Sequence, residues 1–396
     1  MEKNYNKKNK LKVVETFKEQ EMERKKIVFN VVNIKNWMGG VYYAQNIINL
    51  IMHSERLQQK YEVHVLTSSA HAHVFEKFGE SIKLVEMDYE NYYLNSLYFI
   101  KYMRKNKIDY WYALSMNIVE KLLVKKAILW IADFQYIHLP QYFSGIEWKT
   151  RNATSKYMAK QNNVLVLSSE DARRDFVENY KKNKSNCYVV HFTSAIEEEV
   201  RKITKDKEDQ ILQKYGLYGK IYIYIPNQFW QHKNHLVVLR MIEKFIKNNK
   251  DEVLFVFTGQ MHDYRSKEYT EKLRKYFEQE DIDERTVNLG FLDREEQLII
   301  MKNACFLIQP SLFEGWGTVL EDAKVLDKRV ILSDLEVHKE QQYEKCTLFQ
   351  RDNPNDLLDK VNRFLKDDVK DDLEAGIERF HKESRNYAKE LERILL

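Results

Sequence analysis

The sequence predicts an α/β protein with two domains, each built on a parallel β-sheet. Short apolar runs of strand length alternate with longer helical stretches along the chain, which is the pattern of parallel α/β architecture. The 396 residues are enough for two domains that each bury a core of their own. The charged stretch 197–213 carries no strand pattern and separates two sets of apolar runs, so we place the domain boundary near it.

The expected elements follow this alternation along the chain. Residues 1–25 are polar and charged and are expected to form an N-terminal arm. The first domain, residues 26–200, has apolar runs at 27–32, 63–67, 82–85, 110–114, 127–131, 164–167 and 188–192. The second domain, residues 201–379, has them at 221–225, 253–257, 287–289, 305–309 and 330–332, with helices expected over 235–248 and 266–280. Ligands of open α/β sheets bind beyond the carboxyl ends of the strands, so the loops after these runs are the places to look for a site.

Several classes of protein are excluded by what the sequence lacks. No apolar run can span a bilayer, and no apolar core of a signal peptide follows the N-terminal lysines, so we expect a cytoplasmic protein. The cysteines Cys187, Cys305 and Cys346 are too few and too far apart to indicate disulfides or a zinc site. The glycine motifs of dinucleotide dehydrogenases and phosphate-loop nucleoside triphosphatases are absent, and so are the His-Glu-x-x-His and paired Cys-x-x-Cys motifs of metal sites. We expect no metal and no nucleic-acid partner.

The most informative segment is the loop that follows the apolar run 305–309. The run breaks at Pro310, and a helix is expected to begin near Thr318. Gly315 and Gly317 leave the loop without side chains, so a ligand can approach the backbone closely. The free N–H groups at the start of the following helix favour phosphate.

Carboxylates lie on both sides of this glycine loop. Glu314 enters it, and Glu321 and Asp322 fall in the first turn of the expected helix. Carboxylates there can accept hydrogen bonds from sugar hydroxyls, which indicates a nucleotide-sugar site. Acids in a first helical turn also complement the helix dipole, so the other loops are needed to decide between these readings.

Three further loops carry polar residues at the end of an expected strand. Lys233 follows the run 221–225 and could offset the charge of a diphosphate. Gly39 and Gly40 follow the first strand and again permit close backbone approach to an anion. Asp133 and His138 follow the run 127–131 and could face a cleft, although a single histidine in such a place also suits a structural role.

Together these segments resemble glycosyltransferase family 4, a group of retaining sugar transferases with the two-domain GT-B fold, whose sheets face each other across a cleft. Glu314-Gly315-Trp316-Gly317 is similar to the family's Glu-Gly-Phe-Gly, which is followed by a carboxylate eight residues after the first. Asp322 stands at that position and Glu321 one residue earlier, so which of the two contacts the ribose is open. The final segment, 380–396, resembles the family's helix that crosses back to the first domain.

The resemblance also implies roles for individual residues. Lys233 matches the basic residue that binds the donor diphosphate, while Gln228 stands near the position where the family usually has an arginine. Catalytic roles are implied for Glu314 and for His138, which lies where the family often has a sugar-contacting histidine. The implied donor-binding residues are Lys233, Gln228, Gly315, Trp316, Gly317, Thr318, Glu321, Asp322, Gly39 and Gly40.

The implied reaction moves a sugar from a nucleoside diphosphate sugar to a hydroxyl of a glycan or lipid-linked acceptor, with retention of configuration and without a cofactor. The segments 133–135 and 138–140 resemble a subgroup that builds cell-surface polysaccharides. Two alternatives stay open: a nucleotide-sugar epimerase with the same donor site, and a non-catalytic nucleotide-sugar-binding scaffold. Release of nucleoside diphosphate only in the presence of an acceptor separates them.

A contact with the membrane surface is a further hypothesis. The excess of Lys and Arg over Asp and Glu lies in the first 200 residues. The segment 92–105 combines tyrosines and leucines with Lys101, Arg104 and Lys105 on an expected helix. Such a helix suits peripheral attachment to an anionic membrane. The alternative is that its aromatic residues are core and its lysines are simply solvated.

Overall fold

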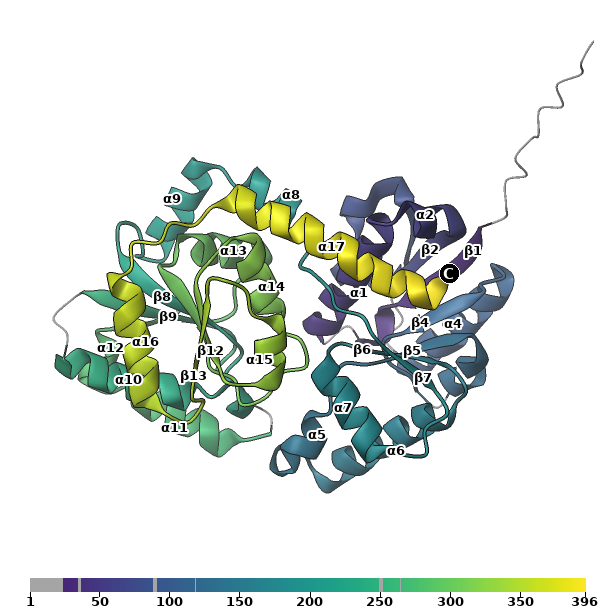
Figure 1. The fold of residues 1–396 in the computed structure, drawn as a ribbon, viewed down its shortest axis with the longest axis horizontal. Helices are drawn as coiled ribbons and strands as arrows, with labels where there is room; N and C mark the ends of the chain where they lie inside the picture. Colours follow the sequence, from purple (N-terminus) through teal and green to yellow (C-terminus); the bar gives the residue numbers. More distant parts are fainter. Residues whose placement is uncertain (1–23, 35–36, 88–90, 118, 249–251, 264) are drawn as a thin grey trace, which may run out of the picture.

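A computed structural model describes residues 24–34, 37–87, 91–117, 119–248, 252–263 and 265–396. It contains two separate parallel sheets, flanked by helices and lying side by side (Figure 1). This confirms the predicted α/β fold with two Rossmann-like domains. The predicted N-terminal arm, 1–25, falls almost wholly outside the described residues.

The first sheet has seven strands in the order β3-β2-β1-β4-β5-β6-β7, all parallel. Parallel pairing requires a crossover after each strand, and the intervening segments supply it as helices. The strands are β1 (Lys25–Asn30), β2 (Tyr61–Thr67), β3 (Ile82–Glu86), β4 (Tyr110–Ala113), β5 (Ala127–Ile131), β6 (Val164–Leu167) and β7 (Asn186–Val189). The helices are α1 (Met38–Met52), α2 (Glu55–Lys60), α3 (Ser69–Ala72), α4 (Tyr92–Lys105), α5 (Gln135–His138), α6 (Gly145–Lys160) and α7 (Glu170–Asn179), with a 3-10 helix η3 (Glu120–Lys126) before β5.

The second sheet has six parallel strands in the order β10-β9-β8-β11-β12-β13. They are β8 (Ile221–Pro226), β9 (Val253–Thr258), β10 (Thr286–Asn288), β11 (Phe306–Gln309), β12 (Val330–Ser333) and β13 (Cys346–Phe349). Its helices are α10 (His235–Asn248), α11 (Lys267–Phe277), α12 (Glu280–Asp283), α13 (Arg294–Asn303), α14 (Thr318–Val325), α15 (Glu336–Gln341) and α16 (Pro354–Lys366). Between the sheets the chain forms α8 (Glu197–Lys202) and α9 (Lys205–Lys214).

The structure corrects three details of the predicted elements. The edge strand β13 was not expected, because it has only four residues and three of them are only half-buried. The run predicted at 188–192 corresponds to β7, which spans Asn186–Val189 and so ends three residues earlier than predicted. The helix predicted over 266–280 ends at Phe277, and a separate short helix α12 follows.

One long helix, α17 (Leu373–Leu395), runs along both halves of the molecule (Figure 1). Its first part buries Ile377 and Phe380 in the core of the second sheet. Its last part buries Leu391 and Leu395 in the core of the first sheet. The helix therefore joins the two cores, and it begins several residues before the predicted start at 380.

Candidate active site

Glu314 lies at the carboxyl end of the second sheet, just after β11, and is held there by three donors. Lys233 Nζ and Ser311 Oγ each lie 2.6 Å from Glu314 Oε1, and Gln309 Nε2 lies 3.1 Å from it. Gln309 is itself fixed by Asn227, because their side-chain amides exchange two hydrogen bonds at 2.9 and 3.1 Å. All three donors converge on Oε1, and none of the described residues donates to Oε2, which is therefore the oxygen available to a ligand.

The Glu314 carboxylate stays ionised although it is buried. Burial alone would raise its pKa, but the charge of Lys233, the nearby His338 and the hydrogen bonds from Lys233 and Ser311 outweigh this and hold the pKa at about 2. Lys233 and Glu314 form an ion pair in which the side chains are only 15% and 10% exposed. The lysine that a diphosphate would bind at this site is therefore already paired with the carboxylate of Glu314.

Local backbone geometry explains how Lys233 reaches this position. Asn234 follows it in the left-handed conformation, with φ of 54°, which an asparagine tolerates better than most residues. The Asn234 side chain donates to the carbonyls of Pro310 and Arg351 at 3.2 and 2.9 Å, and so ties the Lys233 loop to the Glu314 loop. Gln228 precedes Lys233 in the same loop, and its Oε1 accepts from the backbone N–H of Gln260 at 2.8 Å.

The first domain faces this site through the loop after β5. A side chain at Gly315 would lie 2.7 Å from the carbonyl oxygen of Ala132 and 2.9 Å from Asp133 Cβ. The absence of a side chain at Gly315 therefore serves close contact between the domains, a purpose that the sequence did not indicate. Burial raises the pKa of the Asp133 carboxyl, partly offset by a hydrogen bond from the Gln135 N–H and by Arg151, while Glu314 adds to the increase.

His138 also comes from the first domain and reaches the Glu314 loop. Its ring lies 5.4 Å from that of Phe313, the residue before Glu314. Its Nε2 lies 2.7 Å from an oxygen of Asp175, and its side chain is 46% exposed. The structure thus brings together Glu314, Lys233, Asp133 and His138, which are far apart in the sequence.

The glycine loop is held from two sides. The N–H of Gly317 donates to Gln341 Oε1 at 3.1 Å, and Gln341 Nε2 donates back to the Gly317 carbonyl at 2.8 Å. Trp316 Nε1 donates to the carbonyl of Phe192 at 3.1 Å, and its ring lies 4.6 Å from that of His191. Trp316 therefore anchors the loop to the segment after β7. Thr318 begins α14.

Glu321 and Asp322, adjacent on α14, point to different surroundings. Glu321 is enclosed beside Lys324 at 3.0 Å and accepts from Gln341 at 2.7 Å, and burial raises the pKa of Glu321. Asp322 receives two hydrogen bonds from Arg294, at 2.5 and 2.8 Å, and one from Ser194 Oγ at 2.5 Å. Both carboxylate side chains are 1% exposed, and the difference lies in their partners: the Arg294 side chain is 23% exposed, whereas that of Lys324 is 5% exposed.

Gly39 and Gly40 begin α1 beneath the ring of Trp37. A side chain at Gly39 would lie 2.9 Å from Trp37 Nε1, and one at Gly40 would lie 2.6 Å from Trp37 Cε3. Trp37 stacks on Trp130 with centroids 5.6 Å apart. The described contacts of these glycines are therefore with an indole ring, and their approach to donor phosphates stays a prediction.

Sequence reasoning missed several residues that complete this site. Arg294 follows the predicted strand run 287–289 and its loop, but no motif in the sequence marks it. Asp175 and Gln341 were also missed, because each acts on a residue distant in sequence, His138 and Gly317 respectively. No pattern within a short window marks such partners. Among the described residues, no group of three or more His, Cys, Asp and Glu side chains could hold a metal ion.

Similarity to known proteins is found at the level of both sequence and structure. Residues 205–386 match the family model described as glycosyl transferases group 1, which covers somewhat less than half of the chain. A search of the curated proteins found no match to the sequence.

Solved structures share the fold over almost the whole chain. Anabaena Alr3699/HepE in complex with UDP-glucose has a TM-score of 0.68 at 14% identity, covering 93% of this chain and 98% of that one. A glycosyltransferase from Rickettsia africae ESF-5 has a TM-score of 0.64 at 15% identity, covering 93% and 94%. The sucrose-phosphate synthase of Thermosynechococcus elongatus has a TM-score of 0.59 at 13% identity, covering 92% and 94%. The fold is that of the GT-B glycosyltransferases, and the family match of the second domain supports an enzyme that acts as a glycosyltransferase.

Proposed function

We propose that this protein is a retaining glycosyltransferase that moves a sugar from a nucleoside diphosphate sugar to a hydroxyl of a glycan or lipid-linked acceptor. The observation that carries the proposal is the buried Lys233–Glu314 pair at the end of β11, opposite Asp133 and His138 of the first domain. A cation for the diphosphate and a carboxylate for the sugar stand side by side in this pair. The UDP-glucose bound to Alr3699/HepE supports a nucleoside diphosphate sugar as the donor class.

In the proposed reaction the protein acts mainly by electrostatics. Lys233 and the N–H groups at the start of α14 stabilise the negative charge that develops on the departing diphosphate. Glu314 Oε2 and His138 Nδ1 bind sugar hydroxyls, while the diphosphate oxygen assists deprotonation of the acceptor hydroxyl. Donor binding in this scheme needs no metal ion.

The proposed acceptor side includes a surface that suits an anionic membrane. One face of α4 exposes Tyr93, Leu94 and Leu97, which are 58%, 52% and 55% exposed. The same face continues into exposed basic residues, and the adjacent η3 adds Leu122, which is 77% exposed. We call this surface the α4 face: Tyr93, Leu94, Leu97, Lys101, Arg104, Lys105 and Leu122. Apolar tips beside cations match the interface of a bilayer.

This surface favours a cytoplasmic enzyme of cell-surface polysaccharide synthesis that works at the inner face of the membrane. No helix in the described part of the chain has the length and apolar character needed to cross a bilayer. Attachment is therefore proposed as peripheral, with the lipid-linked end of the acceptor held beside the first domain.

The test is a screen of nucleoside diphosphate sugars with purified protein and polyprenyl-linked or soluble glycan acceptors. Release of nucleoside diphosphate that depends on acceptor supports transfer, and NMR of the anomeric proton of the product shows whether configuration is retained. Chelation with EDTA is expected to leave the rate unchanged. Interconversion of the donor without acceptor would instead identify an epimerase, and binding without turnover would identify a scaffold.

A further inference from the structure

His138 is held by a carboxylate of its own domain. Its Nε2 lies 2.8 Å from Asp175 Oδ1 and 2.7 Å from Asp175 Oδ2. Asp175 is 12% exposed at its side chain and sits in the second turn of α7. None of the described residues bonds to His138 Nδ1, so this second ring nitrogen is the one that a ligand can use.

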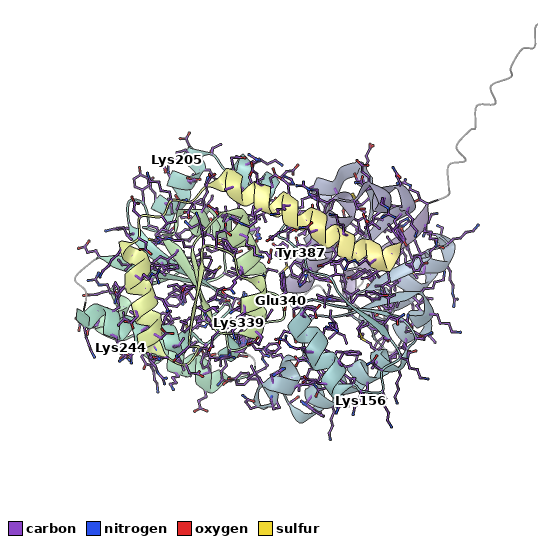
Figure 2. The ribbon with its side chains drawn as sticks, in the orientation of Figure 1. Lys156, Lys205, Lys244, Lys339, Glu340 and Tyr387 are labelled. Atoms are coloured by element: carbon purple, nitrogen blue, oxygen red, sulfur yellow. The ribbon has the colours of Figure 1, made fainter. Side chains whose placement is uncertain are left out.

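The helix that carries Asp175 is held at its start by the second domain. Glu340, on α15, accepts from the backbone N–H groups of Glu170 and Asp171 at 2.8 and 3.4 Å. These N–H groups begin α7, where a carboxylate also complements the positive end of the helix dipole. Figure 2 shows Glu340 where α15 meets the first domain. Glu340 Oε1 also lies 2.8 Å from His191 Nε2.

These contacts form a closed path around the candidate site. The path runs from Glu340 to the start of α7, along α7 to Asp175, from there to His138, and from His138 back to Phe313 of the second domain. Gln341, next to Glu340, binds both backbone groups of Gly317. The short helix α15 therefore contacts the glycine loop through Gln341 and, through Glu340, the start of the helix that carries Asp175.

We propose that Asp175 is the positioning residue for His138, and that Glu340 makes this positioning depend on contact between the two domains. The inference rests on the proposed function, in which His138 binds the donor sugar. It adds that His138 is oriented to bind the sugar only when Glu340 of the second domain contacts the start of α7.

The chemical consequence concerns the proton on His138. The hydrogen bond to Asp175 raises its pKa, burial opposes the increase, and the charges of Asp175, Asp171 and Asp133 add to it. A protonated ring donates from both nitrogens, so Nδ1–H is available for a sugar hydroxyl while Nε2–H stays on Asp175. A neutral ring with Nε2–H on Asp175 would leave Nδ1 only as an acceptor.

The first test is Asp175→Asn, which keeps the shape of the side chain and removes its charge. We expect kcat to fall on the order of tenfold with little change in the KM for the donor. Because the variant lowers the pKa of His138, the alkaline limb of the kcat–pH profile should move to lower pH. Glu178→Gln, on an exposed position of the same helix, is the matched control. The proposal is overturned if the kcat–pH profile of the variant is unchanged, including the case in which kcat and thermal stability both fall.

The second test is Glu340→Gln, alone and combined with Asp175→Asn. If Glu340 acts through Asp175, the double variant should lose little more kcat than Asp175→Asn alone. Losses that multiply would show that Glu340 acts independently and would overturn the link between the domains. Glu336→Gln, in the same helix α15, serves as control because its carboxylate pairs with Lys339 at the surface.

A third measurement separates this inference from the proposed function. The titration of His138 is followed by NMR, with the signal assigned through His138→Gln. Asp175→Asn should lower the measured pKa of His138 even in the absence of any substrate. A lowered pKa in a protein without transfer activity would refute the proposed function and keep the positioning. An unchanged pKa in an active enzyme would refute the positioning alone.

Discussion

At the scale of single residues, the site depends on the buried ion pair between Lys233 and Glu314. Lys233 compensates the charge of Glu314 in this structure and, in the proposed reaction, that of the donor diphosphate. A buried carboxylate that loses its partner becomes harder to ionise. The effects of changing either residue should therefore be coupled and not additive.

Glu314→Gln is expected to lower kcat on the order of a hundredfold or more, because a charged contact that assists the reaction is replaced by a neutral one. The fold should be retained, since the amide can still accept from Ser311 and Lys233. Turnover is measured with the donor identified by the screen, and circular dichroism checks the fold. Near-normal turnover would contradict the role of Glu314.

Lys233→Ala is expected to weaken binding of nucleoside diphosphate far more than binding of the free nucleoside. No arginine stands at Gln228, so charge compensation of the diphosphate rests heavily on this lysine. Isothermal titration with both ligands gives the comparison, and Lys233→Arg should recover part of the loss. Equal weakening for both ligands would show that Lys233 does not bind the diphosphate.

Asp322→Asn and Glu321→Gln should have different effects, although the residues are adjacent. Asp322 lies beside the partly exposed Arg294, so its change should weaken binding of nucleoside and nucleotide alike, as loss of a ribose contact would. Glu321 is enclosed with Lys324, so its change should lower the melting temperature with little effect on affinity. Thermal melts and titrations of both variants decide between them, and the reverse pattern would assign the ribose contact to Glu321.

At the scale of elements, α4 shows how one helix can serve a core and a surface. Phe99 and Met103 are buried, whereas Tyr93, Leu94 and Leu97 are exposed on the opposite face. The reading of this segment as core therefore holds for part of its apolar residues, and its contact with a membrane stays a prediction. Arg104 and Lys105 also complement the dipole at the end of the helix.

The α4 face is expected to bind liposomes that contain anionic lipid. Replacement of Lys101, Arg104 and Lys105 by Gln should reduce pelleting, because each basic residue near the surface contributes about 1 kcal/mol. Leu94→Ser with Leu97→Ser should reduce it as well, while nucleotide binding is unchanged in both variants. Salt should release the protein, since exposed charges are screened over about 8 Å at physiological ionic strength. Absence of pelleting at low salt would leave a diffusible enzyme.

The elements show what sequence alone can and cannot predict. The strands with continuous apolar runs, such as β8 and β9, were predicted to within a residue or two, because burial on both faces leaves a clear pattern. The edge strand β13 was missed because half-burial at Cys346–Thr347–Leu348 removes that pattern. Glu314 and Lys233 could be singled out by their loops, whereas the meeting of Gly315 with Ala132 depends on how two domains dock. No local propensity encodes such docking.

At the scale of the whole molecule, the domains are held together by a cluster centred on His191. Its Nε2 binds Glu340 at 2.8 Å, and its Nδ1 lies 3.2 Å from Glu390 on α17. Burial alone would lower the pKa of His191, but the bonds and charges of Glu340 and Glu390 outweigh it and raise the pKa to about 9. The imidazolium is therefore the form that the folded protein favours.

His191→Gln is expected to destabilise the protein most strongly at low pH. A group whose pKa rises from 6.5 to about 9 on folding contributes stability that is full below pH 6.5 and lost as the pH rises through 9. The difference in melting temperature between wild type and variant should therefore be greatest below pH 6.5 and small above pH 9. A difference that is independent of pH would show that the imidazole acts only by packing.

The long helix α17 also has a consequence for synthesis on the ribosome. The core around β1–β7 includes Ala388, Leu391 and Leu395, which are made about two hundred residues after β7. At translation rates of 5–20 residues per second the nascent first domain waits roughly 10–40 s for its last core residues. Through that interval the nascent first domain lacks the helix that packs against α1 and α2 in the folded protein. The first domain leaves the ribosome before the second, but its core is completed only when the end of α17 has been made.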